Sequence, residues 1–131
     1  MRLVLTAVIF LGGLFFLATG MNFLFNPASA AAGFGVSATS TTGLAAIRAD
    51  MGAFFIVSSL CMMLGAWRRN GDLLLVASSF YAVALLGRLI SMGMDGMQDG
   101  FWIPMVVEGV TVSILLIGSR VLPHDDFPAA D

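Results

Sequence analysis

Four long apolar runs constrain the fold of this chain more than any other feature. Each run spans 22 or 23 residues, and about 20 residues of α-helix suffice to cross the hydrocarbon core of a bilayer. Inside lipid, every backbone polar group needs an internal partner, which only helices and closed β-barrels provide. The runs lack the alternation of barrel strands. We therefore predict an all-α integral membrane four-helix bundle, with helices at Leu3–Phe25, Leu44–Ala66, Leu73–Met94 and Phe101–Leu122.

The composition indicates that lipid, rather than water, covers this chain. Hydrophobic residues make up 59% of the 131 residues and charged residues 11%, whereas soluble domains carry about 25% charged residues. A soluble chain this short could not bury so much apolar surface, because small domains leave a large fraction exposed. The net charge of −2 and the scattered arginines give no reason to expect nucleic-acid binding. We expect residues 1–131 to form a single transmembrane domain.

The connections between the runs predict the orientation of the bundle. Asn26-Pro27 ends the first run, and we interpret the stretch rich in Ala, Gly, Ser and Thr up to Gly43 as a break. The connection between the third and fourth runs is acidic, with Asp95 and Asp99. Because cytoplasmic loops carry an excess of positive charge, we predict that both termini are cytoplasmic. The arginines that flank the helix ends on that side are Arg2, Arg68, Arg69 and Arg120.

The first run also has the features of a secretory signal peptide. Arg2, the apolar run and Ala28-Ser29-Ala30 resemble a charged start, an apolar core and a cleavage site. A signal core usually spans about 7–15 residues, and this run is longer. We therefore expect the first helix to be retained.

Four ionisable residues lie inside the apolar runs: Arg48, Asp50, Arg88 and Glu108. A charge within a membrane span is costly, and it marks either a functional site or a paired network. Counted inward from the predicted outer helix ends, these residues lie about 6, 9, 9 and 10 Å deep. The bilayer midplane lies about 15 Å deep. Two positive and two negative residues therefore share one layer in the outer half, where we expect them to pair.

Helical spacing divides these charges into two groups. Tyr81, Arg88 and Asp95 recur every seven residues on a small, polar face that should contact protein. Asp50 points almost opposite to Arg48 on its helix. We expect Arg48 to extend toward the lipid headgroups, and Asp50, Arg88 and Glu108 to form a core cluster. The candidates for binding or for the charge network are Asp50, Arg88, Glu108, Tyr81, Asp95 and Arg48.

Short motifs follow one another along nearly the whole chain: Asn26-Pro27, Gly33-Phe34-Gly35-Val36, Ile47-Arg48-Ala49-Asp50-Met51-Gly52, Leu86-Gly87-Arg88-Leu89, Asp95-Gly96 and Glu108. This order resembles a family of small bacterial four-helix inner-membrane proteins of unknown function. The resemblance implies a multi-pass protein of the bacterial inner (plasma) membrane, and it implies no activity. Small multidrug exporters differ, because they need an acidic residue in the first helix. The vitamin K reductase and disulfide-forming families need paired cysteines, whereas this chain has Cys61 alone.

Three function classes remain open. The first is a structural or accessory bundle, in which the charges pair with one another. The second is a small transporter or binder of an anionic or zwitterionic solute, in which Arg88 holds the anion and Glu108 or Asp50 titrates. The third is an enzyme acting on a lipid or quinone, for which only Glu108 with Asp50 offers a carboxylate pair. We favour the first, and we expect no catalytic residue, cofactor or metal. The expected partners are the lipid bilayer and either a second copy or a larger membrane complex.

Overall fold

The computed structural model describes residues 1–97 and 99–123, and within them the chain forms helices and no β-strand. The all-α prediction is confirmed for this part of the chain. Residues 124–131, whose sequence includes the acidic residues Asp125 and Asp126, lie outside the described residues. The helices are α1 (Arg2–Phe25), α2 (Pro27–Ala32), α3 (Thr41–Trp67), α4 (Gly71–Asp95) and α5 (Trp102–Val121).

The four long helices coincide closely with the four apolar runs. The largest difference is the start of α3, which lies at Thr41 rather than Leu44. The helix begins earlier because Ser40 caps it: the Ser40 hydroxyl accepts a hydrogen bond from the Gly43 backbone N–H at 3.0 Å. Asn70 caps the start of α4 in the same way. Such side chains satisfy backbone donors that lack a partner in the first turn of a helix.

The interpretation of the whole segment from Asn26 to Gly43 as a break is corrected by α2. Pro27 occupies the start of this short helix, where its fixed φ fits the helix and its missing N–H costs nothing. Ala30 and Ala31 are buried, with 8% and 1% of their surface exposed. These two alanines therefore pack against the long helices, and the segment is not an open loop.

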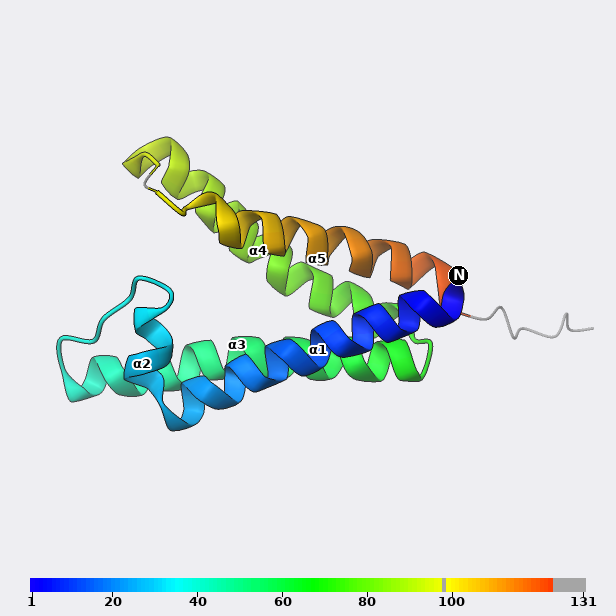
Figure 1. Cartoon of the computed structure of the whole chain (residues 1–131), viewed down its shortest axis with the longest axis horizontal. Helices are drawn as coiled ribbons and strands as arrows, with labels where there is room; N and C mark the ends of the chain where they lie inside the picture. The colour runs from blue at the N-terminus through cyan, green and yellow to red at the C-terminus, as the bar shows by residue number, and fades with distance from the viewer. Residues whose placement is uncertain (98, 124–131) are drawn as a thin grey trace, which may run out of the picture.

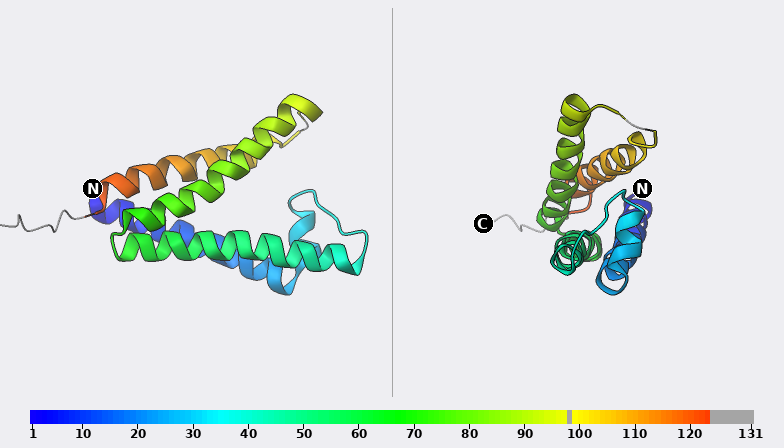
Figure 2. Two further views of the ribbon diagram at one scale, coloured as in Figure 1. Left: turned by 180° about the vertical axis from the view of Figure 1, so that it is seen from behind. Right: turned by 90° about the vertical axis from the view of Figure 1, so that its left-hand side faces the viewer.

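The long helices form two antiparallel pairs that meet at one end and separate at the other (Figure 1). α1 packs along α3, α4 packs along α5, and α3 is joined to α4 by a tight turn. Figure 2 shows the separation from behind and from the end. We call the two ends the loop end, which carries α2 and the α4–α5 turn, and the arginine end, which carries Arg2, Arg68, Arg69 and Arg120.

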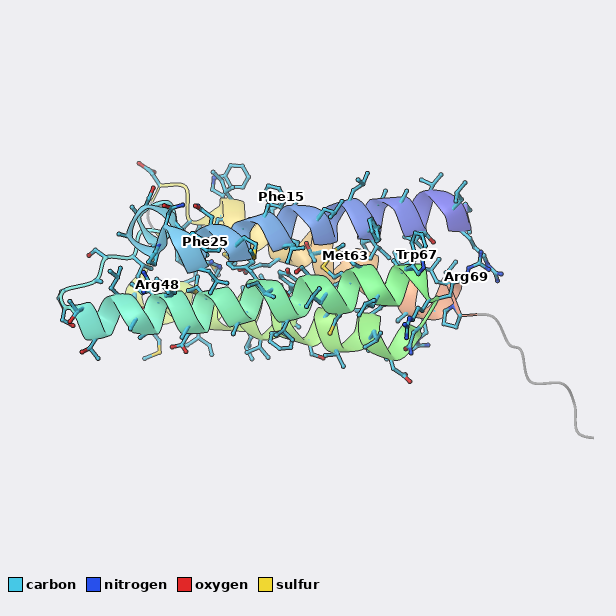
Figure 3. The ribbon with its side chains drawn as sticks, turned by 90° about the horizontal axis from the view of Figure 1, so that it is seen from below. Phe15, Phe25, Arg48, Met63, Trp67 and Arg69 are labelled. Atoms are coloured by element: carbon cyan, nitrogen blue, oxygen red, sulfur yellow. The ribbon has the colours of Figure 1, made fainter. Side chains whose placement is uncertain are left out.

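Two glycines of α1 allow the close approach of α3. A Cβ atom on Gly13 would lie 2.6 Å from the Met63 side chain, and one on Gly20 would lie 2.7 Å from Ile56. Small residues at helix contacts let backbones approach closely in membrane proteins. Figure 3 shows α1 and α3 side by side, with Met63 at their contact. The pair therefore depends on the absence of side chains at these glycines.

The space between the two pairs at the loop end is partly occupied by the segment Pro27–Val36, which we call the wedge segment (Figures 1 and 2). The Phe34 ring lies 5.4 Å from the Phe23 ring and 5.7 Å from the Phe55 ring, measured between centroids. Phe23 and Phe55 are buried residues of α1 and α3. The wedge segment thus covers apolar surface of the α1–α3 pair at the end where the α4–α5 pair has moved away.

Each of the four long helices is long and apolar enough to cross a membrane. Large apolar side chains on all of them are exposed, including Phe15, Leu64, Val83 and Val106. Such exposure is unfavourable in water, whereas a spanning helix presents apolar side chains to lipid. Figure 3 shows Trp67 and Arg69 at one end of the α1–α3 pair and Phe25 with Arg48 at the other.

We expect α1 to remain part of the mature protein rather than being removed as a signal peptide. α1 contributes the buried residues Ile9, Phe16 and Phe23 to the core, and its removal would expose the apolar surfaces that they cover. The intact mass of the protein purified from membranes should include α1. A mass that corresponds to cleavage after Ala30 would contradict this prediction.

Candidate functional site

An ion pair between Arg88 of α4 and Glu108 of α5 joins the two helices of one antiparallel pair. The Arg88 Nε–H is shared between the carboxylate oxygens, at 2.9 Å from Oε1 and 3.1 Å from Oε2. The Glu108 side chain is 11% exposed and the Arg88 side chain 30% exposed. Within a span, a charge of this kind requires a partner, and here each residue supplies it for the other.

The turn between α4 and α5 brings the two residues to the same level. The α4 helix ends at Asp95, and the chain reverses through Gly96 and Gly100, which have φ values of 87° and 82°. Glycine adopts such positive φ angles without steric cost. Glu108 then lies on the buried side of α5, which also carries Leu115. The spacing of the two charges from this turn therefore sets their pairing.

The terminal nitrogens of Arg88 remain available. Both oxygens of Glu108 accept from Nε alone, whereas an arginine fork usually engages a carboxylate through two nitrogens. Within residues 1–97 and 99–123, Nη1 and Nη2 make no hydrogen bond. Arg88 can therefore hold Glu108 and still donate to a second acceptor.

Asp50 does not join this pair, which corrects the expectation of a three-residue core cluster. Asp50 is exposed, and it makes no hydrogen bond or ion pair with another described residue. Four residues further along α3, the Phe54 ring contacts the rings of Phe80 and Tyr81 of α4. Beyond that level α4 diverges from α3 (Figures 1 and 2). Asp50 therefore lies on the part of the α1–α3 pair from which α4 has diverged.

Arg48 has a protein partner that the sequence did not indicate. Its Nε donates to the backbone carbonyl of Leu24 at 2.9 Å, in the last turn of α1. The last carbonyls of a helix lack intrahelical partners, and a positive charge there is favoured by the helix dipole. Arg48 therefore caps α1 at this atom. The side chain is exposed, and its extension toward the lipid headgroups stays a prediction. Figure 3 places Arg48 beside the end of α1, near Phe25.

Tyr81 and Asp95 have separate environments from the pair. Tyr81 is only 1% exposed, and its hydroxyl lies 3.1 Å from the Ser58 hydroxyl of α3. Ser58 is not among the candidates for the charge network that the sequence indicated. A polar residue in the middle of an apolar run was the signal that could have identified it. Asp95 is exposed at the end of α4 and bonds to no other described residue. Tyr81 therefore links α3 to α4, while Asp95 stays at the surface.

Other parts of the described chain offer little chemistry. Among residues 1–97 and 99–123, no three His, Cys, Asp or Glu side chains are grouped to hold a metal ion. Cys61 is half-buried and free. An apolar hollow lies between α1 and α5 at the arginine end, lined by Met1, Val4, Leu5, Val8, Ile114, Ile117 and Val121. None of its lining residues belongs to the charged pair.

The fold and this site define a class of helical protein with four helices suited to cross a membrane and an ion pair inside two of them. The chain belongs to the family described as Domain of unknown function (DUF4345), whose model matches residues 4–118. This match covers most of the chain, and the family description indicates no activity. No curated protein and no solved structure matches the sequence.

Proposed function

We propose that this protein is a non-enzymatic, structural or accessory four-helix bundle of the bacterial inner membrane, with both termini in the cytoplasm. The observation that carries this proposal is the direct contact between Arg88 and Glu108. Because the carboxylate is almost fully buried and already paired, it fastens α4 to α5. A residue that titrates during transport would instead need access to water.

The orientation is supported by the charges at the two ends. The arginine end carries four arginines, and the loop end carries Asp95 and Asp99. Asymmetry of arginine near span ends sets membrane orientation. In a Cys61→Ala background, a membrane-impermeant maleimide added to intact cells should label an Asp99→Cys variant and not an Arg68→Cys variant. The reverse pattern of labelling would contradict the proposed orientation.

A second function, binding or transport of an anionic or zwitterionic solute, is favoured by one observation. The terminal nitrogens of Arg88 carry N–H groups without a partner in the described chain, and arginine forks recognise carboxylates and phosphates. The two functions differ in their response to small anions. Under the structural proposal, inorganic phosphate, acetate and glycine leave the thermal stability of the purified protein unchanged. Stabilisation that disappears in the Arg88→Leu/Glu108→Leu variant would favour the second function.

A further inference from the structure

Asp50 is a carboxylate without a partner inside a helix that is suited to span a membrane. It is exposed, and no described residue bonds to it. Ionisable residues in spans almost always pair or face water. Asp50 lies nine residues from Thr41, the first residue of α3, roughly 13 Å along the helix, so it is not a terminal residue of the span. Within the described chain, Asp50 therefore has no partner that would offset the cost of a charge in a span.

Arg88 offers the complementary charge at the same level. Asp50 lies eight residues from Ser58 along α3, and Arg88 lies seven residues from Tyr81 along α4. The hydroxyls of Ser58 and Tyr81 meet at 3.1 Å. Both charges therefore lie about 10–12 Å from this contact, toward the loop end. One charge has no partner, and the other has terminal nitrogens to spare.

Pairing of these two residues within one chain is opposed by the wedge segment. Closing α4 onto α3 at the loop end would bring the α4–α5 pair toward the surface that Pro27–Val36 covers. There the Phe34 ring packs against Phe23 and Phe55, and Ala31 is 1% exposed. The closing motion would have to displace these contacts. These contacts therefore favour an acceptor from outside the chain over closure within it.

The faces beside the two charges are shaped for another helix. Ala46 and Ala53 lie one turn on either side of Asp50 and are exposed. On α4, a Cβ atom added to Gly87 would meet nothing within 4 Å, in contrast to Gly13 and Gly20, which α3 covers. Small exposed residues permit close approach of a partner helix, and here they adjoin the two charges that need partners.

We propose that two copies of this chain form a two-fold dimer, in which Asp50 of each copy pairs with Arg88 of the other. The two-fold axis lies along the membrane normal. Such an axis keeps every residue at the same depth in both copies, so only residues of equal depth can meet across it. Asp50 and Arg88 meet this condition, and the interface is self-complementary in charge. This inference rests on the membrane insertion contained in the proposed function.

Cysteine cross-linking separates the dimer from closure within one chain. Ala53 lies one turn from Asp50 and Ala84 lies one turn from Arg88, both toward the arginine end. In a Cys61→Ala background, Ala53→Cys and Ala84→Cys variants are co-expressed as separate chains and treated with a thiol cross-linker in membranes. A cross-linked species of twice the monomer mass is expected. If the co-expressed chains stay at the monomer mass, the proposal is overturned. It is also overturned if a chain that carries both cysteines links only internally and stays at the monomer mass.

The charge dependence tests the pairing itself. Asp50→Asn should weaken dimerisation about tenfold, because both symmetry-related contacts lose a charge. Asp72→Asn, which changes an exposed carboxylate at the arginine end, should leave dimerisation unchanged. The readout is energy transfer between labelled copies in lipid vesicles of increasing dilution, after membrane insertion has been established by fractionation. An inserted monomer overturns the dimer, and equal dimerisation of the Asp50→Asn variant overturns the pairing of Asp50 with Arg88. Failure to insert overturns the proposed function instead.

Discussion

Replacing Arg88 with leucine is expected to lower the free energy of unfolding by about 3 kcal/mol. The substitution removes the partner of Glu108, whose side chain is only 11% exposed. A buried carboxylate without a partner must either stay charged in a medium of low polarity or take up a proton. The loss should appear in unfolding titrations with sodium dodecyl sulfate in lipid bicelles. Arg68→Leu, which removes an exposed arginine at the arginine end, is the matched control and should change stability by less than about 0.5 kcal/mol.

The reciprocal substitutions separate a structural pair from a binding site. Glu108→Leu should cost less, about 1–2 kcal/mol, because Arg88 is 30% exposed and can reach other acceptors. The Arg88→Leu/Glu108→Leu variant should recover to within about 1 kcal/mol of the natural protein, since an apolar pair can replace an ion pair. A double variant that is less stable than Arg88→Leu would contradict the mutual pairing of these residues.

Replacing Gly20 with valine is expected to destabilise the α1–α3 pair by about 3 kcal/mol. Even a single added Cβ atom would lie 2.7 Å from the Ile56 side chain, 3.0 Å from the Ile56 backbone nitrogen and 3.1 Å from the Phe55 Cβ. Because backbone atoms are among these neighbours, the clash cannot be relieved by rotating one side chain. The helices must move apart, and Phe23 and Phe55, whose rings lie 5.7 Å apart, would lose contact.

Gly12→Ala is the matched control on the same helix. A Cβ atom at Gly12 would meet only the end of the Met62 side chain, at 3.4 Å. This distance is an ordinary contact with a flexible group, so the free energy of unfolding should change by less than about 0.5 kcal/mol. Equal losses in Gly12→Ala and Gly20→Val, measured in the same bicelle titration, would show that the α1–α3 contact does not depend on the glycine at position 20.

The sequence predicted the site only in part, because charge and depth are local properties but orientation around a bundle is not. Arg88 and Glu108 are placed at one level by their distances from the same turn, so their pairing could be anticipated. Asp50 has a comparable depth, yet it remains outside the pair because α4 leaves α3 beyond Phe54. Arg48 found its partner in a backbone carbonyl of Leu24, which no side-chain pattern could indicate.

The sequence by itself determined the all-α class and the limits of the four long helices to within three residues. Runs of apolar residues, broken by polar and glycine-rich turns, are sufficient for that, whereas the cap at Ser40 sets the earlier start of α3. Only the tertiary structure decided that the helices form two pairs that diverge, with the wedge segment between them. In helices that are apolar all round, periodicity does not mark the buried face. The close approach at Gly13 and Gly20, and the packing of Phe34, select the arrangement instead.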